Sequence, residues 1–165
     1  MKPILLFAIG NESRGDDALG PRLAREIETW LEKSQGDAPV EVIEEFQLQI
    51  ENTLDMLGRD LVLFVDAGQG RAAPFSFYEA RPAPCDAHTS HALTPEALLG
   101  VFDKVHAIAP PAAFVLCVAG VGFGLGEPLS GAAASNLERA TGFCRQLFEQ
   151  PTPGEWRRYT EIDHA

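Results

Sequence analysis

The sequence has few basic residues, few cysteines and no long apolar run. Of its 165 residues, 13 are Lys or Arg and 24 are Asp or Glu, giving a formal net charge of −11. Nucleic acids and anionic membrane surfaces are bound by clustered Lys and Arg, so neither is an expected partner. No apolar run approaches the roughly 20 residues that cross a bilayer.

The cysteines and the N-terminal residues together indicate the cellular compartment of the protein. Cys85, Cys117 and Cys144 lie far apart with no C-x-x-C pair, which excludes a disulfide framework and a zinc knuckle and fits a reducing environment. The opening stretch, MKPILLFAIG, has a lysine and an apolar run, but a charged turn follows where a signal peptide would have a small-residue cleavage site. We therefore expect a cytoplasmic protein.

Several catalytic signatures are also missing. The sequence contains no H-E-x-x-H, no G-x-S-x-G and no G-K-[ST], which argues against a zincin protease, a serine hydrolase of the elbow type and a P-loop enzyme. The alternating glycines of GVGFGLG at 120–126 differ from a dinucleotide-binding loop. Cys117 and Cys144 lie in apolar surroundings and are interpreted as core residues rather than nucleophiles.

What the chain does contain is a regular alternation of strand and helix patterns. Apolar or alternating runs predict strands at 3–9, 40–46, 60–68, 74–80 and 112–122. Helical spacing and capping signals predict helices at about 17–33, at 50–58, after Thr94 and at 131–149. This order predicts a single α/β domain over residues 1–150. It would be a three-layer sandwich with a five-stranded, mostly parallel twisted sheet, one antiparallel strand at 74–80, and helices on both faces. Residues 151–165 show no clear period and are expected to form a loosely packed extension.

Polar side chains follow the predicted strands where catalytic groups of such sheets gather, at the carboxyl ends. Asp16 and Asp17 follow the first strand, Asp66 closes the third, and His88 and His91 precede the third long helix. Carboxylates with one imidazole suit a borderline divalent ion such as Ni²⁺, Zn²⁺ or Mn²⁺. Each residue also has a structural interpretation, namely a helix cap for one of the paired aspartates, turn chemistry for Asp66 and a backbone-bonded loop histidine.

Four segments in order resemble the [NiFe] hydrogenase maturation proteases. They are IGNESRGDDALG with its Gly-Asn turn and paired acids, the strand LVLFVDA, the sequence SHAL at 90–93, and VAGVGFGLGEPLS before the last long helix. The resemblance runs over about residues 4–149. It implies a nickel-dependent, aspartyl-type endopeptidase whose metal-binding residues fall on Asp17, Asp66 and His91, with Asp17 and Asp66 also the catalytic candidates.

The resemblance further implies a substrate and a source for the metal. The partner would be a hydrogenase large-subunit precursor that already carries nickel, and the enzyme would remove its C-terminal extension without an organic cofactor. Asp16 would support Asp17 or cap the helix, and His88 is a second-choice ligand. Two other interpretations stay open: a hydrolase or phosphatase with a resident divalent metal, and a chaperone that senses nickel without cutting.

The chain departs from the family pattern at two places. Ala18 stands where the family usually has glycine after the paired acids, and a helical first turn accepts alanine. After the second strand, Glu45–Gln49 replaces the family's Asp-Gly-Gly-Thr-like turn and resembles the branch that serves soluble hydrogenases. Because this stretch lies at the same predicted edge, it is a candidate for contacting the substrate.

Overall fold

The protein is described by a computed structural model that covers residues 1–34, 39–84 and 93–160. One five-stranded sheet organises it, in the order β2-β1-β3-β5-β4. The strands are β1 (Ile4–Ile9), β2 (Val40–Glu45), β3 (Leu61–Gln69), β4 (Phe75–Ala80) and β5 (Ala112–Gly120). Every neighbouring pair is parallel except β4 with β5, which is antiparallel. The expected fold class is therefore confirmed, including the antiparallel edge strand.

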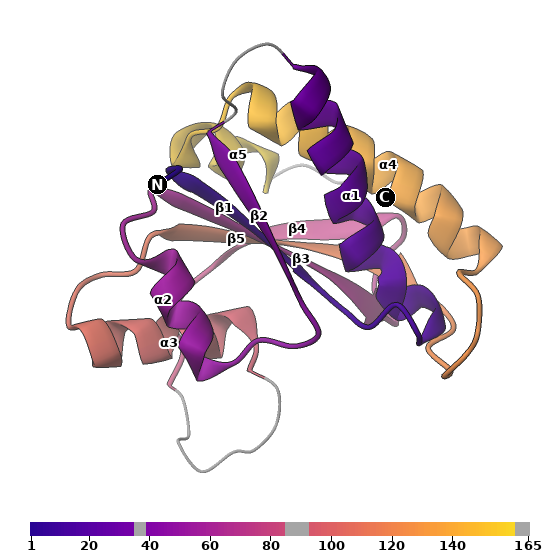
Figure 1. The fold of residues 1–165 in the computed structure, drawn as a ribbon, viewed down its shortest axis with the longest axis horizontal. Helices are drawn as coiled ribbons and strands as arrows, with labels where there is room; N and C mark the ends of the chain where they lie inside the picture. The colour runs from indigo at the N-terminus through magenta and orange to yellow at the C-terminus, as the bar shows by residue number, and fades with distance from the viewer. Residues whose placement is uncertain (35–38, 85–92, 161–165) are drawn as a thin grey trace.

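Helices cover both faces of this sheet. They are α1 (Leu19–Lys33), α2 (Thr53–Met56), α3 (Pro95–His106), α4 (Gly131–Glu149) and α5 (Pro153–Tyr159), with short 3-10 turns η1 (Gly15–Ala18) and η2 (Ile50–Asn52) before α1 and α2. Figure 1 shows α1, α4 and α5 on one face and α2 and α3 on the other. No helix in the described segments is both long and apolar enough to cross a membrane.

The sequence explains how the two layers form on either side of β1. Successive side chains of a strand point to opposite faces. Leu6 and Ala8 accordingly pack in the core under α1 and α4, and Leu5 and Phe7 in the core under α2 and α3. Because both faces are covered, the strand is apolar throughout instead of alternating.

Helix starts follow the predicted capping signals on the carboxyl side of the sheet. The Thr94 hydroxyl accepts a hydrogen bond from Ala97 N (3.1 Å) ahead of Pro95, and the Ser130 hydroxyl accepts one from Ala133 N (3.1 Å). Each bond satisfies one of the N–H groups that a helix start leaves without a partner.

The expectation of a loosely packed tail is wrong for residues 153–159. These residues form α5, whose Trp156 is completely buried and donates from Nε1 to Leu147 O (2.8 Å). The ring packs edge-on against Phe114 and Phe77, so α5 completes the apolar layer over β4 and β5. A seven-residue helix with one anchoring aromatic is too short to show a helical period in the sequence.

Candidate functional site

The topology creates a crevice between β1 and β3. The chain places β2 on one side of β1 and β3 on the other, so the strand order reverses at β1, and ligands of open α/β sheets bind outside the carboxyl ends at such a point. Asp17 follows β1 and Asp66 lies near the carboxyl end of β3. Both line one cavity of about 440 Å³. The structure thus brings these two predicted residues together.

The turn after β1 is built to present Asp17. Gly10 has a φ of 151°, and a Cβ there would collide with the Asp17 carbonyl oxygen, which explains the glycine. Asn11 N donates to Asp17 Oδ2 (2.7 Å), and Asn11 Oδ1 accepts from Ser13 N (2.9 Å). The Gly-Asn pair therefore orients the carboxylate through the backbone.

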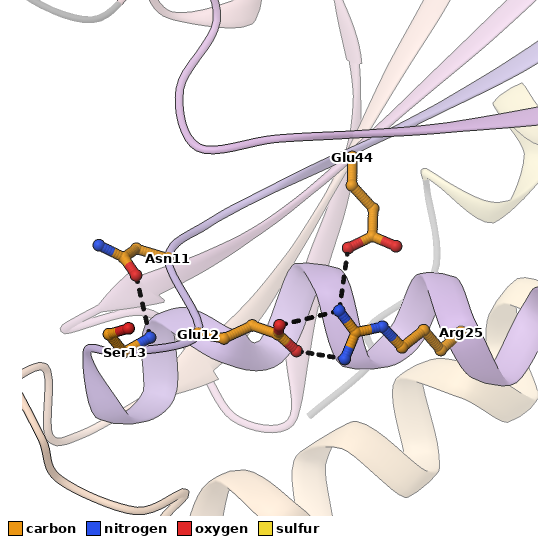
Figure 2. Close-up of polar contacts among 5 residues, drawn as sticks. All are labelled: Asn11, Glu12, Ser13, Arg25 and Glu44. Carbon is orange, nitrogen blue, oxygen red and sulfur yellow. Dashed lines mark hydrogen bonds and ion pairs between the residues drawn. The ribbon is translucent and has the colours of Figure 1, made fainter.

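The same turn is fastened to its neighbours by an exposed ion-pair network, shown in Figure 2. Arg25 of α1 donates to both carboxylate oxygens of Glu12 and to Glu44 Oε1 of β2 (3.4 Å). Exposed pairs contribute little to stability. Their effect here is geometric, because the network links the β1 turn to α1 and to the β2 edge of the crevice.

Asp16 does not cap a helix, contrary to one interpretation from the sequence. Neither η1 nor α1 has a side-chain cap. Instead the fully buried carboxylate accepts from Val121 N (2.8 Å), Gly122 N (3.1 Å), Ser130 N (2.8 Å) and Ser130 Oγ (2.7 Å). Asp16 therefore fixes the loop after β5 and the start of α4 against the turn that carries Asp17, which is a supporting role.

Those hydrogen bonds also determine the charge of Asp16. Burial acts to raise the pKa of its carboxyl, but the donors from Ser130, Val121 and Gly122 outweigh it and hold the pKa below the ordinary value. Hydrogen bonds to the ionised form favour that form. Asp16 is consequently an anion at neutral pH.

Asp66 has the opposite character. Burial raises the pKa of its carboxyl to about 7, with a hydrogen bond from Ala67 N (2.8 Å) lowering it and the nearby charge of Asp17 raising it. A carboxyl that titrates near neutral pH in a cleft has the property of a proton-transfer group or of a ligand that exchanges a proton for a cation. The sequence predicted the position of Asp66 but not this environment.

The third predicted ligand, His91, lies outside the described residues, as do His88 and Cys85. Within the described segments, no three His, Cys, Asp or Glu side chains are grouped so that they could hold a metal ion. Asp17 and Asp66 are thus two carboxylate donors whose predicted imidazole partner belongs to the segment before α3.

Three cavity residues had no role in the sequence-based prediction: Arg71, Tyr78 and Glu96. Tyr78 of β4 and Glu96 of α3 share a hydrogen bond across the cavity, which together with burial raises the pKa of the Tyr78 phenol. Cys117 is buried as expected, and its thiol also lines this cavity. Only Arg71 could have been noticed in the sequence, as the one basic residue between Asp66 and Tyr78.

The departure at Glu45–Gln49 also lies at this edge, as expected. A second hollow of about 670 Å³ adjoins the cavity and shares Asp17, Phe46 and Gln47 with it. Phe46, which lines both hollows, is 77% exposed. The loop therefore offers apolar contact surface next to Asp17.

No protein-family model and no curated protein matches the sequence. Solved structures do match. A [NiFe] hydrogenase maturation protease, HycI from Thermococcus kodakarensis KOD1, superposes with a TM-score of 0.64 at 21% identity, covering 90% of this chain and 94% of that one. The hydrogenase maturating endopeptidase HybD from E. coli gives 0.67 at 19% identity, covering 88% and 92%. The chain has the fold of the hydrogenase maturation proteases.

A third neighbour, the hydrogenase 2 maturation peptidase from Thaumarchaeota archaeon SCGC_AB-539-E09, gives a TM-score of 0.61 at 18% identity and covers 90% of this chain and 99% of that one. The resemblance seen in the sequence motifs is confirmed at the level of the fold. Since the overlap is nearly complete in both directions, the maturation-protease fold accounts for almost all of the chain.

Proposed function

We propose that the protein is an endopeptidase that removes the C-terminal extension of a nickel-loaded [NiFe] hydrogenase large-subunit precursor. The observation that carries the proposal is the meeting of Asp17 and Asp66 in one cavity at the β1–β3 crevice. The fold supports the same conclusion, because this chain shares it with proteins described as hydrogenase maturation proteases. The reaction would take place in the cytoplasm.

Asp17, Asp66 and His91 would engage the nickel of the substrate. Carboxylate and imidazole donors suit a borderline divalent ion. In this arrangement the metal arrives with the precursor. The enzyme would therefore recognise only a precursor whose nickel has already been inserted. The enzyme would then carry one donor on the turn after β1, one on β3 and the third on the segment before α3.

The carboxylates also provide the acid–base chemistry that peptide hydrolysis needs. A water must lose a proton as it adds to the scissile carbonyl carbon, and the leaving amine must gain one. Asp66, whose carboxyl has a pKa of about 7 because of its burial, is suited to accept and return that proton. Asp17 is the alternative base, and Asp16 holds the turn that carries it.

A processing assay tests the proposal. The purified protein is incubated with nickel-loaded and nickel-free forms of the large-subunit precursor from the same organism, and the precursor mass is followed by mass spectrometry. We expect loss of the C-terminal extension only from the loaded form, and no cleavage by Asp17→Ala at equal protein concentration.

The other outcomes identify the competing interpretations. Complex formation without a change of mass would indicate a nickel-sensing chaperone. Equal cleavage of the loaded and nickel-free precursors would contradict recognition of the metal. Full processing by Asp17→Ala would remove Asp17 from the ligand set.

A further inference from the structure

Arg71 stands out among the residues of the cavity because of its charge. The lining contains three carboxylates, those of Asp17, Asp66 and Glu96, and Arg71 is the one cation among the described lining residues. In a chain with a net charge of −11, Arg71 shares this cavity with three acids that the fold brings together. Each of these acids has a hydrogen bond that does not involve Arg71: Asp17 with Asn11 N, Asp66 with Ala67 N and Glu96 with Tyr78.

The backbone after Asp66 is shaped to hold the arginine stem. A Cβ added to Gly68 would lie 2.6 Å from Arg71 Cγ and 3.4 Å from Arg71 Nε, and 2.5 Å from Cys117 Sγ. The Arg71 side chain therefore lies against the backbone of Gly68, which comes two residues after Asp66, and near the Cys117 thiol. A side chain at position 68 would displace it.

Arg71 is exposed in the free protein, and its charge supplies what a hydrolytic transition state requires. When water adds to a peptide carbonyl, the π electron pair of the C=O bond moves to the oxygen, which becomes an anion. Hydrogen-bond donors placed beside that oxygen stabilise the anion. A guanidinium remains charged throughout and offers several N–H donors.

We propose that Arg71 is a catalytic residue that donates hydrogen bonds to the scissile carbonyl oxygen as it becomes negative. The new C–O bond forms with the water oxygen, and the water proton passes to a carboxylate of the cavity. An electron pair of the oxyanion then re-forms the C=O bond and the C–N bond breaks. The carboxylate delivers the same proton to the leaving amine. Arg71 gains and loses no proton in this cycle.

This inference rests on the proposed peptidase function, and kinetics of the processing assay tests it. The variants are Arg71→Gln and Arg71→Lys, with Arg81→Gln as the matched control, because Arg81 is 80% exposed and pairs only loosely with Glu79 (3.6 Å). We expect Arg71→Gln to lower kcat by about 10²–10³-fold with KM changed less than about threefold, as for loss of one oxyanion donor. Arg71→Lys should recover part of that loss, and Arg81→Gln should behave as the wild type.

Two results would overturn the assignment. An unchanged kcat in Arg71→Gln, or a raised KM at constant kcat, would show that Arg71 binds substrate and transition state equally or not at all. Thermal unfolding of each variant shows whether a lost rate reflects a lost fold. Absence of cleavage by the wild-type protein would instead contradict the peptidase function itself, so the two failures are distinguishable.

Discussion

Asp16 and Asp17 are neighbours in the sequence, but their carboxylates serve different parts of the molecule. Asp17 lines the cavity, whereas Asp16 is buried and bonded to the loop after β5. The sequence predicted that one acid would support the other, because a turn needs at most one cap. It could not show that the support comes from residues more than 100 positions away, since no local pattern records that contact.

Replacing Asp16 should therefore lower the free energy of unfolding by more than the loss of a helix cap would. Asp16→Ala leaves the N–H groups of Val121, Gly122 and Ser130 without their acceptor, and we expect a loss of about 2–4 kcal/mol in the free energy of unfolding, measured in urea at pH 7. Asp17→Ala, which loses only the bond from Asn11 N, is the control and should cost less than about 1 kcal/mol. Equal losses in the two variants would contradict the role assigned to Asp16.

The pH dependence of this loss has a defined sign. Because the folded pKa of Asp16 lies below the unfolded one, its contribution is complete above about pH 4. The contribution disappears as the pH falls through the folded value. The difference between wild type and Asp16→Ala should accordingly shrink in acid.

Asp66 should show the reverse linkage. Its pKa is raised to about 7 by burial, so between about pH 4 and pH 7 the folded protein keeps a proton that the unfolded chain has lost, and stability falls as the pH rises. Asp66→Asn removes the ionisation but keeps an oxygen for Ala67 N. At pH 8 and without added metal we expect it to be more stable than the wild type, on the order of 1–3 kcal/mol, and nearly equal at pH 4. Urea unfolding at the two pH values measures this, and a destabilised variant at pH 8 would contradict the assigned environment.

At the scale of elements, most strands and long helices could be predicted because their signals are local. Continuous apolar runs marked β1, β3 and β5, and Thr94 and Ser130 marked the starts of α3 and α4. The tail could not be predicted in the same way. The burial of Trp156 depends on a surface formed by β4, β5 and α4, which only exists once the sheet is assembled.

Helix α5 should therefore stabilise the whole domain. Trp156→Ala leaves a large cavity beside Phe114 and removes the bond to Leu147 O, and we expect a loss of about 3–5 kcal/mol in the free energy of unfolding. Trp30→Ala, at a half-buried position on α1, is the control and should cost clearly less. Thermal or urea unfolding measures both variants. A Trp156→Ala variant with an almost unchanged free energy of unfolding would instead indicate that residues 153–159 are a loosely packed extension.

At the scale of the whole molecule, the carboxyl ends of the strands were predictable as the place of the site, but the order of the strands was not. Alternating strands and helices are compatible with several orders, and not all of them put β1 beside β3, the pairing that brings Asp17 and Asp66 to one cavity. Arg71, Tyr78 and Glu96 could not be predicted as cavity residues for the same reason: they come from the β3–β4 connection, β4 and α3, whose packing no local pattern specifies.

The whole-molecule prediction concerns where the metal resides. If nickel comes with the substrate, the purified protein should retain well under one equivalent of divalent metal. The described residues supply no group of three ligands, and a cation must displace the proton of Asp66, whose pKa burial raises to about 7. Metal analysis of protein prepared without chelators measures the content. Calorimetric titration with Ni²⁺ at pH 6 and pH 8 should then show weak binding that strengthens with pH. Asp66→Asn should lose part of that strengthening, because the Asp66 carboxyl no longer releases a proton, whereas an imidazole ligand such as the proposed His91 still does so in this pH range. One tightly held ion per chain would instead support a hydrolase with a resident metal at the same carboxylates.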